Sequence, residues 1–499
     1  MTEPRNYLAV DLGAESGRAI VGALDGEKLT LTETHRFANG PVRLPDGLHW
    51  DILRLWSEIK TAIGLASTKT NKKLESIGLD TWGVDFALLD SQGALVSNPF
   101  HYRDARTDGM LEEAFQRMPR AEIFANTGIQ FMQLNTLYQL LSMVLQKSRL
   151  LDVAKTFVTI PDLFNYWLSG QITNEFTNAT TTQCFDPRKR DWAAPVLEAL
   201  SIPTHLFGPV TDSGTPIGSL LPYVGEETGA SGVRVVLPAC HDTGSAVVAV
   251  PAQNRDFAWI SSGTWSIIGA EVAAPHVDEK VLQYNFTNEG GVFDTWRLCK
   301  NITGLWLVQE CKRTWANQGQ GLSYDEIAGL ASEAKPFVAV VDPDHPGFLH
   351  TGNMPERIQK YCVDTNQFVP QTKGEMIRVA LEGIALKYRW MLEKLEELAG
   401  KTLEPIHIIG GGTKNRLLNR FTADCTGRTV IAGPVEATAI GNILMQAIGL
   451  KHLNSLAEAR SIVRTSFTPQ IYEPKRASDW DEAYSRFQKI ISGSFQRQP

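Results

Sequence analysis

Short apolar runs alternate with glycine-rich turns at the start of the chain. Tyr7 to Leu12 is apolar apart from Asp11, GAESG follows it, and Ala19 to Leu24 is apolar again. Apolar runs of this length that are bounded by glycine-rich turns are typical of β-strands. The pattern therefore predicts a strand, a turn and a second strand, and the alternation from Lys28 to Glu33 predicts a third strand.

A helix and two further strands are predicted next. From Asp51 to Leu65, leucine and isoleucine recur at a broadly helical spacing. The apolar runs Leu74 to Thr81 and Val84 to Leu89 predict strands, and the first of them ends close to the acid Asp80. This mixture of strands and helices is typical of an α/β protein.

The same beginning recurs halfway along the chain. Phe257 to Ile260 is an apolar run, SSGTWS makes a turn, and Ile267 to Val272 continues as a strand. The order of strand, turn and strand matches the start of the chain and indicates a duplicated unit. Because 499 residues are too many for one compact core, we expect two α/β domains.

The last part of the chain predicts a core helix followed by glycine turns. Glu375 to Leu398 carries one apolar stripe at helical spacing, and Gly400 stops that helix. Pro405 to Ile409 predicts a short strand that runs into three glycines at 410–412 and then into another helix. A further glycine-rich turn, AGPVEATAIGN, leads into a helix of small and apolar residues.

Composition narrows the classes of partner. The formal net charge of -7 gives no long-range attraction for phosphate backbones or anionic membranes, so we expect neither nucleic acid nor membrane as a partner. No signal peptide opens the chain and no stretch reaches the length of a membrane span, which predicts a cytoplasmic protein. The cysteines form no C-x-x-C pair and so indicate neither a zinc knuckle nor a redox motif. Small molecules remain as ligands.

Three glycine-bearing turns are suited to bind phosphate. Backbone N–H groups can point at a phosphate only where no side chain blocks its approach, and glycine occupies positions 13, 17, 263, 411 and 412. Asp11 beside such phosphates favours a Mg²⁺ ion between them, and the alternative is that Asp11 only organises its own turn. The P-loop and dinucleotide-binding motifs are missing, which disfavours those two classes.

The stretch PACHDTGSA places another acid, Asp242, after an apolar run. Phosphoryl transfer needs an acceptor hydroxyl, a base that takes its proton, and positive charge on the moving group. Asp242 is a candidate for that base, and the alternative is that it is the N-cap of a helix through Gly244 to Val250. One residue can fill both roles.

Four more residues are candidates for contact with a sugar, and three of them have a structural alternative. His241 either binds a substrate hydroxyl or is a structural donor, and Trp82 either lines a sugar face or belongs to the core. Gly83 would let a ligand approach the backbone. Asn301 offers a donor and an acceptor to vicinal hydroxyls, or is a turn residue at a helix start.

Taken together, these segments resemble the FGGY carbohydrate kinases, members of the actin, Hsp70 and hexokinase superfamily. The resemblance covers almost the whole chain and is carried by VDLGAESGR, HRFANG, IGLDTWGVDFALLD, YRDART, IQFMQLNTLYQL, TNATTTQ, HDTGSAV, SSGTWS, NEGG, KNITGLWL, IGGGTKN and AGPVEATAIGN. It implies an α/β fold of two ribonuclease-H-like domains around a central cleft. Residues 1–247 would then mainly bind sugar and residues 248–499 would mainly bind ATP.

The resemblance also implies roles for single residues at matching positions. The nucleotide-binding residues implied are Ala14, Glu15, Ser16, Gly17, Arg18, Thr264, Gln309, Gly411 and Gly412. The sugar-binding residues implied are Gly83, His241, Asp242, Thr243 and Asn301, with Asp80 near the sugar. Trp82 remains a candidate for sugar contact because of its aromatic ring. Asp242 matches the proton acceptor, and Asp11 falls near magnesium. ATP and Mg²⁺ are the expected cosubstrate and cofactor.

Glu15 departs from the family pattern, in which a small residue is usual at this position of the loop. A carboxylate beside ATP is tolerable only if the side chain points outward or toward Arg18. The backbone role of the loop is unaffected.

The activity that the resemblance implies is phosphorylation of a ketose, L-rhamnulose, at its C1 hydroxyl, with L-fuculose and xylulose as alternative acceptors. Sugars that differ at one hydroxyl are separated by few contacts, so the alternatives stay open. A nucleotide-dependent switch of the Hsp70 or actin kind is the alternative from another class. Such a switch needs no base beside a sugar, and the HDT segment argues against it.

Overall fold

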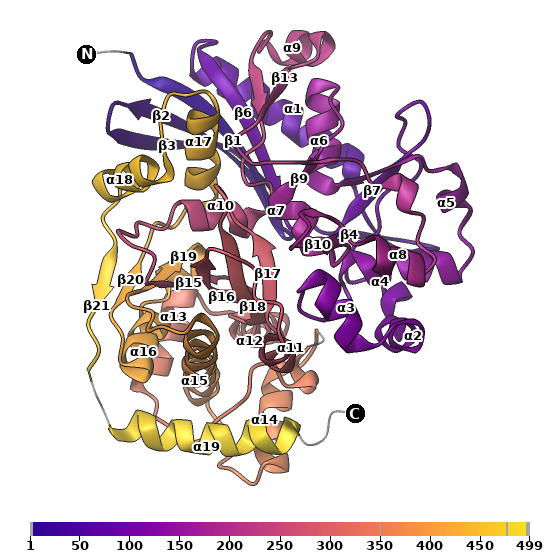
Figure 1. The fold of residues 1–499 in the computed structure, drawn as a ribbon. Coiled ribbons are helices and arrows are strands. Elements are labelled where there is room, and N and C mark those ends of the chain that lie inside the picture. The colour runs from indigo at the N-terminus through magenta and orange to yellow at the C-terminus, as the bar shows by residue number, and fades with distance from the viewer. Residues whose placement is uncertain (1–2, 350, 476–477, 496–499) are drawn as a thin grey trace. The chain divides into compact units, whose positions relative to one another are not determined.

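The computed structural model describes residues 3–349, 351–475 and 478–495 (Figure 1). The chain forms two compact units, and both are discontinuous in sequence. The first unit comprises Met1–Gln253, Glu271–Leu298 and Glu436–Phe467, and the second comprises Asn254–Ala270, Cys299–Val435 and Thr468–Pro499. Two segments from the second half of the chain thus return to the first unit, and the division of sugar and ATP binding at residue 247 stays a prediction.

A six-stranded sheet forms the centre of the first unit, in the order β13-β14-β6-β1-β2-β3. Its strands are β1 (Arg5–Leu12), β2 (Ser16–Asp25), β3 (Lys28–Ala38), β6 (Leu74–Thr81), β13 (Pro216–Ser219) and β14 (Arg234–Val236). Strand β1 pairs antiparallel with β2 and parallel with β6. The predicted hairpin, third strand and strand at 74–81 are all present.

The two faces of this sheet pack against different helices. Leu8, Val10 and Ile77 point to one face and form a core with α1 (Ile52–Lys69) and α6 (Ile160–Ser169). Ser76 and Gly78 point to the other face, where α17 (Ala437–Gly449) contacts β1 and β6 (Figure 1). Alternation along the strands produces this division, since successive side chains of a strand point to opposite faces.

Glycine at position 78 is required by the close approach of α17. A Cβ atom there would lie 2.4 Å from Oδ1 of Asn442 and 2.7 Å from Nε2 of Gln446. The side-chain amides of Asn442 and Gln446 form a buried chain of hydrogen bonds with Ser76, which we call the amide ladder. Gln446 Nε2 donates to Asn442 Oδ1 at 2.7 Å, and Ser76 Oγ donates to Gln446 Oε1 at 2.7 Å. The ladder fixes α17 on the sheet through specific hydrogen bonds.

The remainder of the first unit is built from short elements. Its helices are α2 (Met110–Arg117), α3 (Arg120–Thr127), α4 (Thr136–Leu145), α5 (Arg149–Val153), α7 (Phe176–Ala179), α8 (Ala194–Ala199), α9 (Pro222–Thr228), α10 (Asp242–Val248), α11 (Glu279–Tyr284) and α18 (Leu456–Ser466), with 3-10 turns η1 (Ala105–Thr107), η2 (Thr180–Thr182) and η3 (Thr204–Leu206). Its other strands are β4 (Pro41–Leu44), β5 (Gly47–Trp50), β7 (Phe86–Leu89), β8 (Thr156–Thr159), β9 (Asn174–Glu175), β10 (Phe185–Asp186), β11 (Asp191–Trp192), β12 (Val210–Thr211) and β17 (Thr287–Gly290). The predicted strand at 84–89 is the shorter β7, which pairs with β8.

The second unit repeats the arrangement of a sheet with helices. Its strands run in the order β18-β16-β15-β19-β20-β21, with bounds β15 (Ala258–Ser262), β16 (Trp265–Val272), β18 (Trp296–Thr303), β19 (Ile406–Ile409), β20 (Val430–Ala432) and β21 (Gln470–Tyr472). The boundaries between the units fall inside β16, after Ala270, and inside β18, after Leu298. Its helices are α12 (Trp306–Asn317), α13 (Tyr324–Glu333), α14 (Met354–Asp364), α15 (Lys373–Ala399), α16 (Arg416–Thr426) and α19 (Ser478–Phe495), with 3-10 turns η4 (Pro346–Phe348) and η5 (Gly411–Lys414). The predicted hairpin at 257–272 and the predicted core helix are β15-β16 and α15.

Capping defines both ends of helix α15. The Thr372 side chain accepts from the backbone N of Glu375, and the Glu375 side chain accepts from the backbone N of Thr372, so the two residues form a capping box. Gly400 ends the helix in a left-handed conformation, which glycine adopts without cost. The apolar face of this helix and its end at Gly400 could therefore be predicted from the sequence.

The six cysteines all fall within the described residues, and each is free and buried. Among the helices that the structure describes, none is both long enough and apolar enough to cross a membrane.

Candidate active site

Strands β1 and β6 bring two acids side by side in the first unit. Asp11 and Asp80 are register partners in the parallel pair and are both buried. Arg18, opposite Asp11 on β2, binds Oδ2 of Asp11 through Nε at 2.8 Å and Nη2 at 2.6 Å. It also lies 3.1 Å from Glu436 through Nη1. The carboxylate of Asp11 therefore pairs with an arginine, and the local turn bond considered above is not what holds it.

Asp80 is fully buried, and only one of its two carboxylate oxygens has a hydrogen-bond partner among the described residues. Its Oδ2 accepts from Nδ2 of Asn442 at 2.6 Å, whereas its Oδ1 has no hydrogen-bond partner among the described residues. Burial, and then the charge of Asp11, raise the pKa of Asp80 well above its ordinary value. A buried carboxylate oxygen without a partner is costly, which marks Oδ1 as a candidate ligand atom.

The chain that carries Asp242 lies directly beside the end of β6. Thr81 N donates to the carbonyl of Cys240 at 2.9 Å, and Thr81 pairs with His241 in a parallel bridge. Helix α10 starts at Asp242, and His241 occupies the N-cap position without a side-chain capping bond. The alternative that Asp242 is the N-cap is therefore wrong by one residue, because the chain enters its helical turn at Asp242 itself.

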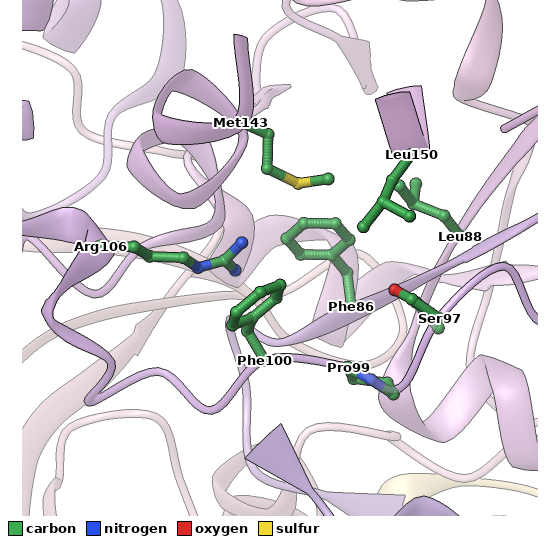
Figure 2. Close-up of a pocket in the computed structure, with 9 residues that line it drawn as sticks. Phe86, Leu88, Ser97, Pro99, Phe100, Arg106, Met143 and Leu150 are labelled. Atoms are coloured by element: carbon green, nitrogen blue, oxygen red, sulfur yellow. The ribbon is translucent and has the colours of Figure 1, made fainter. Parts of the chain in front are cut away.

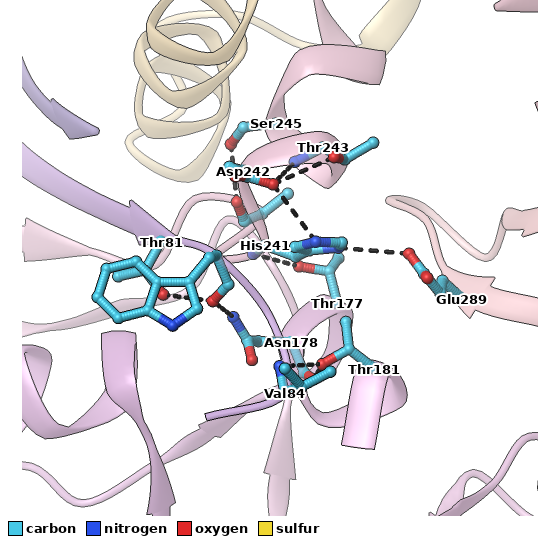
Figure 3. Close-up of polar contacts among 12 residues, drawn as sticks. Thr81, Val84, Thr177, Asn178, Thr181, His241, Asp242, Thr243, Ser245 and Glu289 are labelled. Carbon is cyan, nitrogen blue, oxygen red and sulfur yellow. Dashed lines mark hydrogen bonds and ion pairs between the residues drawn. The ribbon is translucent and has the colours of Figure 1, made fainter. Parts of the chain in front are cut away.

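Every contact described for the Asp242 carboxylate falls on one oxygen. Oδ1 accepts from the backbone N and from Oγ1 of Thr243, the latter at 3.1 Å, and lies 3.3 Å from Nε2 of His241 (Figure 3). The side chain is 31% exposed. Enclosure by the surrounding protein raises the pKa of Asp242, which favours its action as a base. Oδ2 is the oxygen left for a ligand.

Sequence reasoning missed the two residues behind His241. Nη2 of Arg297 lies 3.1 Å from Nδ1 of His241, and Oε2 of Glu289 lies 3.3 Å from the same nitrogen. Arg297 and Glu289 also face one another, with Nη1 and Oε2 at 3.2 Å. Burial opposes ionisation, yet the charge of Arg297 lowers the pKa of Glu289. The NEGG motif contains Glu289, but nothing in the sequence links it to position 241.

A second acid, Glu175, supports the same loop from its backbone side. Its Oε2 accepts from N of Cys240 at 3.1 Å and from Oγ1 of Thr177 at 2.7 Å, and N of His241 donates to Thr177 Oγ1 at 3.1 Å. Glu175 is fully buried. Two consecutive amides before Asp242 are thereby held, directly or through Thr177. The sequence motif TNATTTQ, which begins at Thr177, was the only signal that could have pointed to this support.

The turn after β6 contains a strained residue. Val84 has a φ of 66°, a conformation that a β-branched residue rarely adopts. Its N donates to Oγ1 of Thr181 at 3.0 Å (Figure 3). Its carbonyl accepts from Oγ1 of Thr136 and from Nε2 of Gln139. A Cβ atom on Gly83 would lie 2.9 Å from Thr181 Oγ1, so packing by itself requires glycine there. Sugar contact at Gly83 stays a prediction.

Trp82 belongs mainly to the core. Its side chain is 6% exposed, its ring lies 3.9 Å from that of Trp50, and its Nε1 donates to Oδ2 of Asp85 at 3.0 Å. Burial raises the pKa of Asp85 to about 6 although several donors oppose this. The core alternative for Trp82 is confirmed, and contact with a sugar stays a prediction.

The first glycine turn is shaped by its own backbone and by Asn39. Gly13 N donates to the carbonyl of Ser16 at 3.0 Å, while Asn39 donates through Nδ2 to the Gly13 carbonyl at 2.8 Å and through N to the Glu15 carbonyl at 2.9 Å. Glu15 is exposed, and Arg18 is paired with Asp11 and Glu436. The Glu15 side chain therefore points outward, the arrangement its charge requires beside a phosphate.

The glycine turn of β15-β16 in the second unit is held by the start of α12. The carbonyl of Thr264 accepts from Gly304 N at 3.1 Å and from Trp306 N at 3.3 Å, and that of Gly263 accepts from Leu305 N at 2.9 Å. Asn301 lies on strand β18 and not at a helix start, so the turn alternative for Asn301 is wrong. Gln309 lies on α12.

The glycines after β19 differ in their surroundings. A Cβ atom on Gly412 would lie 2.0 Å from Oγ of Ser262, so the turn packs tightly on β15 at that position. A Cβ atom on Gly411 would meet nothing within 4 Å. Backbone at Gly411 is therefore approachable, as the predicted nucleotide contact requires.

A small cavity of the first unit is separate from these residues. Phe86, Phe100, Arg106 and Met143 are among the residues that line it (Figure 2). The guanidinium of Arg106 lies over the ring of Phe100 at 4.0 Å. None of the predicted site residues lines this cavity, so it is not the site that the sequence predicts.

Acids beside a strained turn in one unit and glycine hairpins in both are compatible with phosphoryl transfer, and sequence comparison identifies the family. The model of the FGGY family of carbohydrate kinases matches with its N-terminal domain at residues 6–249 and with its C-terminal domain at residues 258–450. The chain belongs to this family and is a kinase that phosphorylates a sugar with ATP.

Individual relatives are similar over nearly their whole length. The rhamnulokinase of Bacteroides thetaiotaomicron is 39% identical over 487 residues, which cover 98% of this chain and 99% of the relative. That of Oceanobacillus iheyensis is 42% identical over 465 residues, covering 93% and 97%. The family resemblance seen in the sequence is confirmed.

Solved structures confirm the predicted α/β fold class. A gluconate kinase and a xylulose kinase, both from Lactobacillus acidophilus, superpose with a TM-score of 0.82 at 15% and 16% identity. Each match covers 98% of this chain and 98% of the other. At such low identity the likeness concerns the fold alone.

Proposed function

We propose that this kinase transfers the γ-phosphoryl group of ATP to the C1 hydroxyl of L-rhamnulose, giving L-rhamnulose 1-phosphate in L-rhamnose catabolism. The observation that carries the chemistry is the Asp242 carboxylate, whose described contacts all fall on Oδ1 and leave Oδ2 for a hydroxyl proton. The relatives named rhamnulokinase, 39% and 42% identical across the chain, support the choice of sugar.

Asp242 acts as the general base in this proposal. Oδ2 accepts the proton of the C1 hydroxyl, and the resulting oxygen attacks the γ-phosphorus while ADP leaves. His241, Thr243, Gly83 and Asn301 bind the sugar hydroxyls, with Asp80 and Trp82 nearby. The raised pKa of Asp242 makes its carboxylate a stronger proton acceptor than an exposed aspartate.

The acids at the ends of β1 and β6 fit a magnesium ion. Asp80 Oδ1 is buried without a partner, and Asp11 is its neighbour across the parallel pair. Mg²⁺ commonly takes one or two carboxylates and completes its coordination with phosphate oxygens and waters. When bound, Mg²⁺ would neutralise phosphate charge, and Asp11 is the side chain we assign to it.

The nucleotide is assigned to the glycine turns. Ala14, Glu15, Ser16, Gly17 and Arg18 of the first turn, Thr264 of the second, and Gln309, Gly411 and Gly412 form the proposed ATP contacts. We place the enzyme in the cytoplasm, because six free buried cysteines suit a reducing compartment. Its proposed partners are the ketose and ATP, without nucleic acid or membrane.

A coupled assay of ADP release across purified ketoses tests the proposal. We expect kcat/KM to be highest with L-rhamnulose, lower with L-fuculose and lower again with D-xylulose, and phosphorus NMR to show the product ester on C1. Faster turnover of L-fuculose or xylulose would replace the substrate while leaving the kinase assignment in place. ATP hydrolysis that no ketose accelerates would contradict the sugar-side base.

A further inference from the structure

His241 lies between the proposed base and a buried ion pair. Its Nε2 faces Asp242 Oδ1 at 3.3 Å, and its Nδ1 faces Arg297 Nη2 at 3.1 Å (Figure 3 shows the ring between Asp242 and Glu289). Arg297 is fully buried, and Glu289 and His241 are nearly so. All four side chains belong to the first unit.

The chemistry of arginine fixes the direction of the bond to Nδ1. A guanidinium group carries five N–H donors and no acceptor, and it stays protonated in proteins. Nδ1 of His241 also faces Oε2 of Glu289 at 3.3 Å, but its contact with Arg297 Nη2 is shorter, at 3.1 Å, and only that contact is a hydrogen bond. This geometry favours an Nδ1 that accepts from Arg297, which places the proton of the neutral ring on Nε2. Nε2 then donates to Asp242 Oδ1, the oxygen that Thr243 also occupies.

Glu289 completes the arrangement. Its Oε2 lies 3.2 Å from Arg297 Nη1, so the positive charge behind the ring is balanced. Nε of Arg297 donates to the carbonyl of Gly290 at 2.8 Å, which anchors the guanidinium to the strand that carries Glu289. The ring of His241 is thus held by a rigid and electrically neutral partner.

We propose that Arg297, balanced by Glu289, is a positioning residue that holds His241 as the Nε2–H tautomer, so that His241 clamps Oδ1 of Asp242 and directs Oδ2 to the substrate hydroxyl. This inference rests on the proposed role of Asp242 as the base. It adds Arg297 and Glu289, whose proposed action on the base is through His241.

The tautomer is measured directly, without reference to activity. Long-range nitrogen–proton NMR of the full-length protein, labelled with ¹⁵N in histidine and otherwise deuterated, distinguishes protonated from bare ring nitrogens. His241→Gln identifies the signals of His241 among the 10 histidines. We expect Nε2 protonated and Nδ1 bare. A proton on Nδ1 in the wild-type protein overturns the proposal.

Steady-state kinetics of variants test whether the hold of His241 on Asp242 contributes to kcat. Arg297→Met leaves Glu289 without its ion-pair partner, so a proton should appear on Nδ1 of His241. Glu289→Leu/Arg297→Met removes both charges and so avoids an uncompensated buried carboxylate. We expect the double variant to lose about tenfold or more in kcat, because a clamp on the base is gone, with KM for Mg-ATP within about twofold. Glu289→Gln keeps the arginine donor but leaves its charge unbalanced, so we expect a loss of kcat smaller than that of the double variant.

A matched control comes from another buried ion pair of the same unit. Arg460 Nη2 and Glu271 Oε2 lie 2.8 Å apart with side chains 8% and 4% exposed. Glu271→Leu/Arg460→Met should change thermal stability and leave kcat within about twofold. A folded Glu289→Leu/Arg297→Met that keeps wild-type kcat contradicts the positioning role.

The failures of the two proposals are distinguishable. Asp242→Asn that still turns over shows that the base is elsewhere, whatever the tautomer of His241. An inactive Asp242→Asn together with a proton on Nδ1 in the wild-type protein keeps the proposed function and removes this inference.

Discussion

A single residue, Asn39, holds two carbonyls of the first glycine turn, one through its side chain and one through its backbone N. Its Nδ2 donates to Gly13 O at 2.8 Å and its N donates to Glu15 O at 2.9 Å. If this turn binds phosphate, Asn39→Asp should raise KM for Mg-ATP by about tenfold, because an acceptor then faces the Gly13 carbonyl and a negative charge lies beside the nucleotide. KM for the ketose should stay within about twofold.

Steady-state kinetics with each substrate varied in turn measures this effect. Asn39→Ala serves as the comparison, since it removes the hydrogen bond without adding charge and should raise KM for Mg-ATP by less. Equal KM for Mg-ATP in Asn39→Asp and the wild-type protein would show that the turn does not contact nucleotide.

Residue types at strand ends could be predicted from sequence, and their partners could not. Asp11, Asp80 and Asp242 were all singled out because each lies at the end of an apolar run, and the parallel pairing of β1 with β6 brings the first two together. Arg297 lies 56 positions from His241 in the chain, and its contact depends on a segment that returns to the first unit. No periodicity in the sequence encodes such a contact.

At the scale of elements, the fit of α17 on β6 depends on glycine at position 78. Gly78→Ala would place Cβ 2.4 Å from Asn442 Oδ1 and break the amide ladder that holds Asp80. We expect a loss of about 1–3 kcal/mol in the free energy of unfolding, because neither amide can retreat within the packed interface. Urea unfolding followed by circular dichroism measures it.

A second glycine in the same unit provides the control for that measurement. Gly64 lies inside helix α1, and a Cβ atom there would make an ordinary contact of 3.7 Å with the carbonyl of Thr228. Gly64→Ala should raise stability by about 0.5–1 kcal/mol, since alanine favours the helix. Equal effects of the two substitutions would show that the α17 contact is looser than described.

Regular elements were predictable because their patterns are local. The apolar stripe and glycine stop of α15 and the two glycine hairpins follow from residues within one segment. The strained turn at Val84 was not predictable, because valine ordinarily avoids a φ of 66° and is held there by Thr136, Gln139 and Thr181 from other elements.

For the molecule as a whole, buried acids set the response of stability to pH. Burial raises the pKa of Asp162 to about 7, whereas an aspartate in the unfolded chain titrates near 3.9. The folded protein therefore binds the proton more tightly, and stability from this group is full below about pH 4 and is lost as pH rises toward about 7.

The melting temperature of wild-type protein should accordingly fall more between pH 5 and pH 8 than that of Asp162→Asn, which cannot ionise. Differential scanning fluorimetry in buffers of equal ionic strength measures the two slopes. Parallel slopes would mean that Asp162 is ionised throughout this range in the folded protein.

The chain path explains why the units were harder to predict than the fold class. A duplicated hairpin pattern indicates two α/β domains, and that class is confirmed. Segments Glu271–Leu298 and Glu436–Phe467 nevertheless return to the first unit, where they supply Glu289, Arg297 and Asn442. Hydrophobic patterning identifies such segments as strands and helices but does not say which core they join.

Single-turnover phosphoryl transfer by Asp242→Asn tests the central claim most directly. With saturating Mg-ATP and L-rhamnulose in a rapid-quench experiment, the rate should fall at least ~100-fold while ATP affinity stays within a few-fold, because the substitution removes the base and little volume. Asp212→Asn, at an exposed acid of the same unit, should react at the wild-type rate. A rate for Asp242→Asn within tenfold of wild type would contradict the account.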